Sequence, residues 1–151
     1  MRTPALRFAA SLATGLALAL PVAPAQPSPS PRPPLRSQVF EWSKLAPRVT
    51  PNGERRDVAN HPTPTLAVFE SHITTLNPGR SSHAPHRHPQ EELIIVKEGT
   101  LEATIPGEVH RAGAGSILLF TSNDLHGMRN AGDAPLTYYV IRMITAATPK
   151  A

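Results

Sequence analysis

The chain has 151 residues, which is enough for one domain with a modest core. It contains no cysteine, so disulfide frameworks and thiolate metal sites are excluded. The formal net charge is +4, but no run of lysine and arginine forms a basic patch, which argues against a nucleic-acid-binding protein.

The first 25 residues are typical of an export signal. Arg2 and Arg7 give a basic start, and residues 8–20 form an apolar run that is shorter than the roughly 20 residues of a membrane-spanning helix. Small residues at 23–25 favour cleavage before Gln26. Removing residues 1–25 would lower the formal charge from +4 to +2, because only Arg2 and Arg7 are charged there. We therefore expect a periplasmic or secreted protein, with no stable membrane insertion after cleavage.

A proline-rich linker is expected to follow the signal. Residues 26–36 are polar and rich in proline, so they cannot form a regular helix or a sheet ladder. The folded domain is predicted to span residues 37–145, and residues 146–151 form a short tail.

Short apolar runs separated by glycine and proline fill this predicted domain, and no long helical period occurs. Residues 100–105 alternate apolar and polar side chains, as a half-buried strand does. Strand-sized runs of this kind predict an all-β fold, a single small antiparallel sandwich or barrel. The predicted strands are residues 38–42, 65–76, 91–97, 100–105, 116–121 and 136–144.

Residues 83–92 read HAPHRHPQEE and concentrate three of the seven histidines of the chain. In a strand, side chains two or four residues apart share a face, which groups His86, His88 and Glu92. His83 and Glu91 have the opposite parity and are expected to face elsewhere. Two imidazoles and a carboxylate are ordinary ligands of a divalent ion. A polar surface loop that is rich in histidine by chance is the alternative reading.

Two stretches resemble the paired motifs of the cupin superfamily. Residues 79–99 read GRSSHAPHRHPQEELIIVKEG and match the glycine, His-x-His, glutamate, glycine order of the first motif, with a leading spacer of six residues where five is usual. Residues 115–130 read GSILLFTSNDLHGMRN and match the spacing of the second motif through His126 to Asn130. Thr121 and Asn123 stand where the family has proline and glycine. Asparagine is a sensible substitute because it tolerates positive φ.

The resemblance implies a small antiparallel β-barrel that binds one divalent metal ion. The ligands that it implies are His86, His88, Glu92 and His126. Iron, manganese, nickel, copper and zinc all accept this set.

Four protein ligands leave one or two open positions, as a catalytic site does. The resemblance thus favours a metalloenzyme, of oxygenase type or related, that acts on a small organic molecule; a metal- or ligand-binding protein without turnover is the alternative. Cupins often exchange N-terminal strands, so residues 38–42 predict a homodimer.

Further side chains could line the pocket. His72 faces either the interior or the outer surface of its predicted strand. Tyr138 and Arg142 share a parity, and if their face is inward, Arg142 would offer a cation to an acidic substrate; a surface arginine is the other possibility. Asn130 is expected to fix a turn, and Trp42 to anchor packing.

Overall fold

The structure is a computed structural model, and it describes residues 32–150. The predicted signal at 1–25 and most of the predicted linker lie outside these residues. The described part contains one short 3₁₀ helix, η1 (Trp42–Lys44), and nine strands. The strands are β1 (Arg48–Thr50), β2 (Gly53–His61), β3 (Val68–Leu76), β4 (Glu92–Glu98), β5 (Leu101–Ile105), β6 (Glu108–Ala112), β7 (Ile117–Phe120), β8 (Gly127–Asn130) and β9 (Leu136–Ile144). No described helix is long and apolar enough to cross a membrane.

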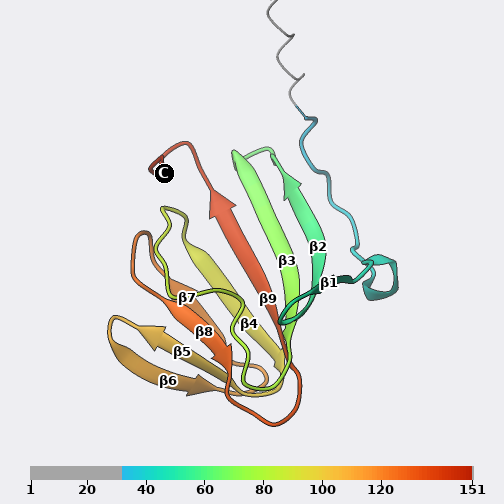
Figure 1. Cartoon of the computed structure of the whole chain (residues 1–151). Coiled ribbons are helices and arrows are strands. Elements are labelled where there is room, and N and C mark those ends of the chain that lie inside the picture. Colours follow the sequence, from blue (N-terminus) through green and yellow to red (C-terminus); the bar gives the residue numbers. More distant parts are fainter. Residues whose placement is uncertain (1–31, 151) are drawn as a thin grey trace, which may run out of the picture. The chain divides into compact units, whose positions relative to one another are not determined.

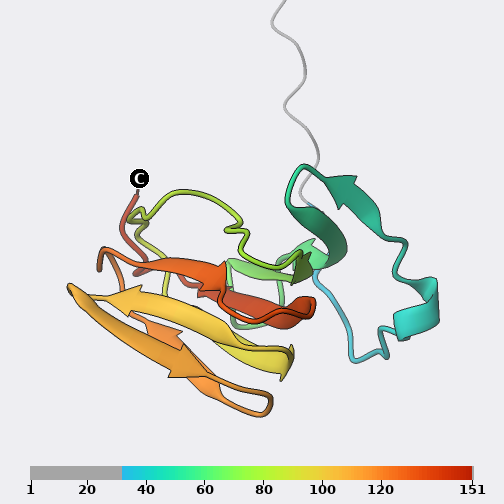
Figure 2. The same ribbon diagram turned by 60° about the horizontal axis from the view of Figure 1, so that its bottom comes forward.

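The strands form two antiparallel sheets. Six strands pair in the order β1-β2-β3-β9-β4-β7, and three pair in the order β6-β5-β8. In Figures 1 and 2 the β5–β6 hairpin lies at the opposite side of the molecule from β1 and β2. The predicted all-β antiparallel class is confirmed. The two sheets do not join into one closed barrel within the described residues, so the architecture is a jelly-roll-like sandwich.

The apolar core lies between the two sheets, and strands β4, β5 and β7 turn alternate side chains into it. Ile94 and Val96 of β4 are fully buried, while their neighbours Leu93 and Ile95 are only half-buried. From the smaller sheet, Leu101 and Ala103 of β5 are also fully buried, as the alternation in the sequence predicted. This shared core fixes the two sheets against each other.

Strand β9 holds a central place in the larger sheet. It pairs with β3 along its whole length and with β4 on its other side. Residues far apart in the sequence therefore lie side by side across β3, β9 and β4, and this positions the polar side chains described below.

The predicted strands 65–76, 91–97, 100–105, 116–121 and 136–144 correspond to β3, β4, β5, β7 and β9. The prediction of a strand at 38–42 is wrong. Residues 38–41 have irregular backbone, and η1 begins at Trp42. Its apolar side chains have no ladder partner there. The spacing of the two motifs left room for a return strand after residues 100–105, and β6 is that strand. Strands β1, β2 and β8 were not predicted. In β2 the reason is its sequence, GERRDVANH, which carries no apolar alternation.

Gly99 explains why the first motif ends in glycine. Its φ is +85°, in the left-handed region that favours glycine, and a Cβ there would lie 2.7 Å from the Leu136 Cα. The turn from β4 into β5 thus passes directly against the start of β9, and only a residue without a side chain fits.

Candidate metal centre

His86 and His126 face each other across a short antiparallel bridge. The His86 N–H donates to the His126 carbonyl (2.9 Å), and the His126 N–H donates to the His86 carbonyl (3.1 Å). The Asn123 N–H donates to the His88 carbonyl (2.8 Å), which continues the pairing. Residues opposite each other in a ladder have side chains on one face, and His88 lies two residues beyond His86. The backbone therefore turns all three imidazoles the same way.

The turn that presents His126 depends on Asn123, whose φ is +62°. This left-handed conformation is the one that the sequence predicted at the position where the family has glycine.

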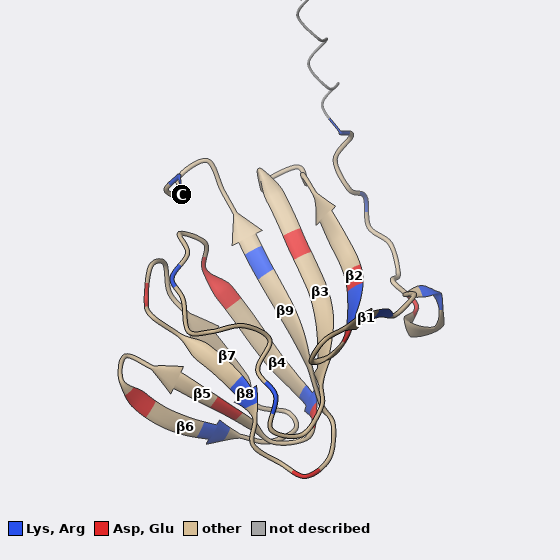
Figure 3. Cartoon of the chain, viewed as in Figure 1, with Lys and Arg blue, Asp and Glu red and all other residues tan. Residues whose placement is uncertain are grey.

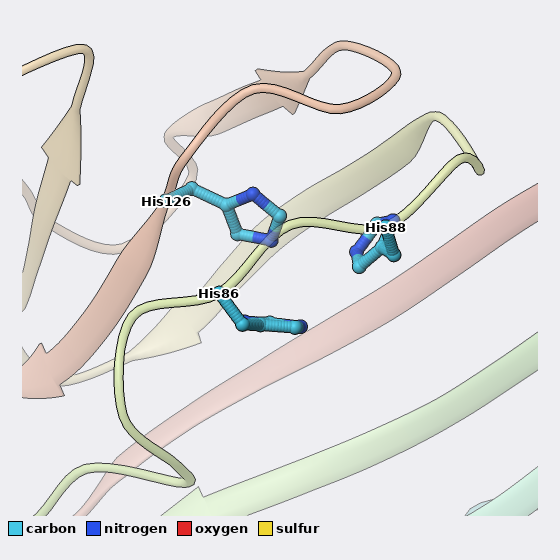
Figure 4. A group of neighbouring side chains, drawn as sticks. All are labelled: His86, His88 and His126. Carbon is cyan, nitrogen blue, oxygen red and sulfur yellow. The ribbon is translucent and has the colours of Figure 1, made fainter. Parts of the chain in front are cut away.

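The three imidazoles converge on one point, as Figure 4 shows. One ring nitrogen of each of His86, His88 and His126 lies within 4.8 Å of the others. The ring centroids are 4.8 Å apart for His86–His126 and His88–His126, and 5.2 Å for His86–His88. Phe120 stacks on His126 with an interplanar angle of 11°, which fixes that ring on its other side.

Backbone carbonyls orient two of the rings. His88 Nδ1 donates to the Gln90 carbonyl (2.8 Å), and His126 Nδ1 donates to the Asp124 carbonyl (2.9 Å). This fixes the proton on Nδ1 and leaves a lone pair on Nε2. Both Nε2 atoms, and His86 Nδ1, are buried and have no hydrogen-bond partner among residues 32–150. Metal-ligating histidines typically show this pattern of one anchored and one free nitrogen.

Burial keeps two of these rings, His86 and His126, neutral at pH 7. Burial lowers the pKa of His86 to about 4, with the neighbouring His83 adding to the effect. Burial also lowers the pKa of His126, although its bond to Asp124 opposes the shift. Neutral imidazoles offer lone pairs, so the donor set fits a divalent ion of the borderline class.

Glu92, the fourth predicted ligand, lies beside this cluster rather than within it. It opens β4 and is 2% exposed. Its Oε2 is 3.5 Å from His88 Nε2 and accepts a 2.6 Å hydrogen bond from Arg142 Nε. Its role as a ligand remains a prediction.

His83 lies closer to the cluster than its parity indicated. Its ring centroid is 4.1 Å from that of His86, in an edge-on contact. The expectation that it faces elsewhere is wrong, because the backbone of residues 82–85 is irregular and Pro85 lies between the two histidines. The alternation that groups His86 with His88 therefore does not extend back to His83.

A cavity of about 210 Å³ adjoins the cluster. Glu92 and His83 line it on the side of the histidines, and His72, Tyr138 and Arg142 line it from β3 and β9. All three residues whose placement the sequence left open therefore face the interior. Burial lowers the pKa of His72 to about 3 and raises that of Tyr138, so both are neutral at pH 7. Arg142 does not offer a free cation, since Glu92 and Glu70 both contact its guanidinium.

Residues 72–142 match the family model described as Cupin domain. Three similar solved structures are KdgF from Halomonas sp. (TM-score 0.60, 19% identity, covering 74% of this chain and 97% of that chain), the polyketide cyclase RemF from Streptomyces resistomycificus (0.59, 17%, 72% and 80%) and a predicted oxalate decarboxylase from Thermotoga maritima (0.57, 19%, 71% and 99%). At these identities the likeness concerns the fold alone. No curated protein matches the chain significantly.

Proposed function

This chain belongs to the cupin superfamily, and from that premise we propose that it binds one divalent metal ion and acts on a small organic molecule. His86, His88 and His126 would hold the ion, with Glu92 as the fourth ligand. Iron, manganese, nickel, copper and zinc are all compatible with this set.

The observation that carries the proposal is the convergence of three imidazoles, with one ring nitrogen of each within 4.8 Å of the others. The Nε2 atoms of His88 and His126 and the Nδ1 atom of His86 are buried without a partner among residues 32–150, and each such atom costs about 1–3 kcal/mol. An ion that accepts lone pairs of these rings would reduce this cost.

The size and position of the cavity support the proposal that a small ligand binds next to the ion. A bound ion with open positions acts as a Lewis acid or a redox centre. The chain itself would position the ligand: neutral His72 and Tyr138 can exchange hydrogen bonds with it, while Val140 and Leu76 supply apolar contact. RemF and the Thermotoga protein, by their names, are a cyclase and a predicted decarboxylase, so enzymes on small organic molecules occur on this fold. For this chain we propose an oxygenase-type or related reaction.

The first experiment is the metal content of the purified mature chain by plasma mass spectrometry. We expect about one equivalent of a divalent metal, and loss of that metal in His86→Ala. His110→Ala is the matched control, because this histidine lies on β6 with about half of its side chain exposed. A folded chain that takes up no divalent ion, or a His86→Ala variant with full occupancy, would overturn the ligand assignment.

A second experiment separates an enzyme from a binding protein without turnover. The metal-loaded chain is titrated with azide while its optical or paramagnetic spectrum is followed. A spectral change shows an exchangeable position on the ion, as catalysis requires. An inert ion would favour the binding protein.

We further propose that the chain is exported to the periplasm or secreted. The supporting observation is the apolar run after Arg7 and the small residues at 23–25. N-terminal sequencing of the chain made in a bacterial host should begin at Gln26. An intact N-terminus on chains recovered from the cytoplasm would contradict export.

A further inference from the structure

Glu70, Arg142 and Glu92 form one row across the larger sheet. Arg142 of β9 is the direct partner of Glu70 of β3 on one side and of Glu92 of β4 on the other. Side chains that are direct partners share a face and lie within reach of each other. Figure 3 shows this arrangement as a basic segment of β9 between acidic segments of β3 and β4.

The contacts within the row are unequal. Arg142 Nε donates to Glu92 Oε2 at 2.6 Å, whereas its Nη1 lies 3.5 Å from Glu70 Oε2. The Glu92 side chain is 3% exposed, and those of Arg142 and Glu70 are both 21% exposed. A short charge-assisted bond in a buried place holds the carboxylate firmly. Glu70 keeps the other side of the guanidinium occupied.

The oxygen that accepts this bond is also the one nearest the histidines. Glu92 Oε2 lies 3.5 Å from the unpartnered Nε2 of His88. Two ligand atoms about 2.1 Å from one ion are separated by about 3.0–3.4 Å in octahedral or tetrahedral geometry. The 3.5 Å between Oε2 and His88 Nε2 is therefore close to the separation of two atoms that bind one ion.

From this arrangement we infer that Arg142 is a positioning residue for Glu92. It holds the Oε2 atom at the edge of the histidine cluster, where this carboxylate would be available to an ion held by the histidines. The inference rests on the proposed metal site. In this role the charge of Arg142 is paired with Glu70 and Glu92. It differs from the role that the sequence left open, a cation that binds an acidic substrate.

The test uses Co²⁺ as the probe, because its visible d–d band reports the ligands of the ion. The affinity of the full mature chain for Co²⁺ is measured by competition with a chelator. Arg142→Met should weaken binding by about 10–100-fold and change the band, as losses of groups that orient ligands do. Arg129→Met is the matched control, since its Nε makes a 2.6 Å bond to Glu102 on the smaller sheet; it should leave both readouts unchanged.

A double variant shows whether Arg142 acts through Glu92. Glu92→Gln alone should weaken binding and change the band, and adding Arg142→Met should weaken it no further. A full additional loss in the double variant would overturn the inference, as would an Arg142→Met chain that binds Co²⁺ like the unaltered one. If Arg142→Met does not fold, Arg142→Lys decides: it retains the buried charge but not the guanidinium, and an unchanged band and affinity would overturn the inference. Failure of the unaltered chain to bind Co²⁺ would instead contradict the proposed function.

Discussion

The buried carboxamide of Asn130 connects three parts of the chain. Its Nδ2 donates to the Leu76 carbonyl (3.0 Å) and the Ala134 carbonyl (2.8 Å), and its Oδ1 accepts from the Gly132 N–H (2.9 Å). The side chain is completely buried. Its predicted role in fixing a turn is confirmed, and the same residue also ties that turn to the end of β3.

Asn130→Ala should lower the free energy of unfolding by about 2–4 kcal/mol, because it leaves buried carbonyls and an N–H without partners. Urea denaturation followed by circular dichroism measures the change. Asn60→Ala, on an exposed position of β2, is the control and should remain within about 0.5 kcal/mol of the unaltered chain. A small effect at Asn130 would mean that water replaces its hydrogen bonds.

Single residues also show which contacts of the site could be predicted from the sequence. The resemblance to the paired cupin motifs brought His86, His88 and His126 together correctly, and the bridge between His86 and His126 is what joins their two loops. The contact of Arg142 with Glu92 could not be read from the sequence, because it depends on the register of β4 against β9, 50 residues apart. His83 was misplaced because the parity that groups His86 and His88 does not extend back through the irregular backbone of residues 82–85.

At the scale of elements, β7 carries two adjacent leucines that lie on opposite faces of the sheet. Leu118 is 8% exposed and packs in the core, while Leu119 is 55% exposed on the outer face. The sequence places two leucines side by side and carries no sign of which one is buried. The pairing of β7 with β4 decides it, since Leu118 is the partner of buried Ile94.

This pair allows a matched test of the strand assignment. Leu118→Ala should lower the free energy of unfolding by about 2–4 kcal/mol, through lost burial and the cavity that remains. Leu119→Ala should cost less than about 1 kcal/mol, because water already reaches much of its side chain. Thermal or urea denaturation of both variants compares them directly. Equal losses would show that the outer face is covered in solution.

For the whole molecule, we expect acid to lower the free energy of unfolding through the buried histidine His72. The folded pKa of His72 is about 3, below its ordinary value of 6.5, because of burial and the nearby charges of Arg55 and Arg142. Between these values His72 binds a proton in the unfolded chain but not in the folded one. Its effect on the free energy of unfolding is therefore absent above pH 6.5, and it lowers that free energy as the pH drops toward 3. Urea denaturation with chelator at pH 7.5 and 4.5 should show this fall.

His72→Gln should lose less stability between these two pH values than the unaltered chain does. His110→Gln, at an exposed site, should behave like the unaltered chain. The same acid response in all three chains would contradict the neutral, buried state of His72.

The association of whole chains is a separate prediction. The N-terminal segment exposes three apolar side chains, with exposed fractions of 83% at Val39, 38% at Phe40 and 40% at Trp42. Since no described strand pairs with residues 38–41, exchange of this segment between two copies remains our proposal. Light scattering after size exclusion should give the mass of a dimer, and Val39→Asp should shift the mass toward the monomer. A monomeric unaltered chain would contradict the proposal.

The bridge between His86 and His126 joins two segments that are 40 residues apart in the chain. An ion held by both residues would act as a cross-link that closes this loop. A disulfide that closes a loop of that length is worth about 4 kcal/mol in the chain-entropy description, yet this chain has no cysteine. For a protein that we propose works outside the cytoplasm, the ion would then protect the fold from proteases as well as serving chemistry, and its removal would expose the loops that carry the histidines, residues 77–91 and 121–126, to cleavage first.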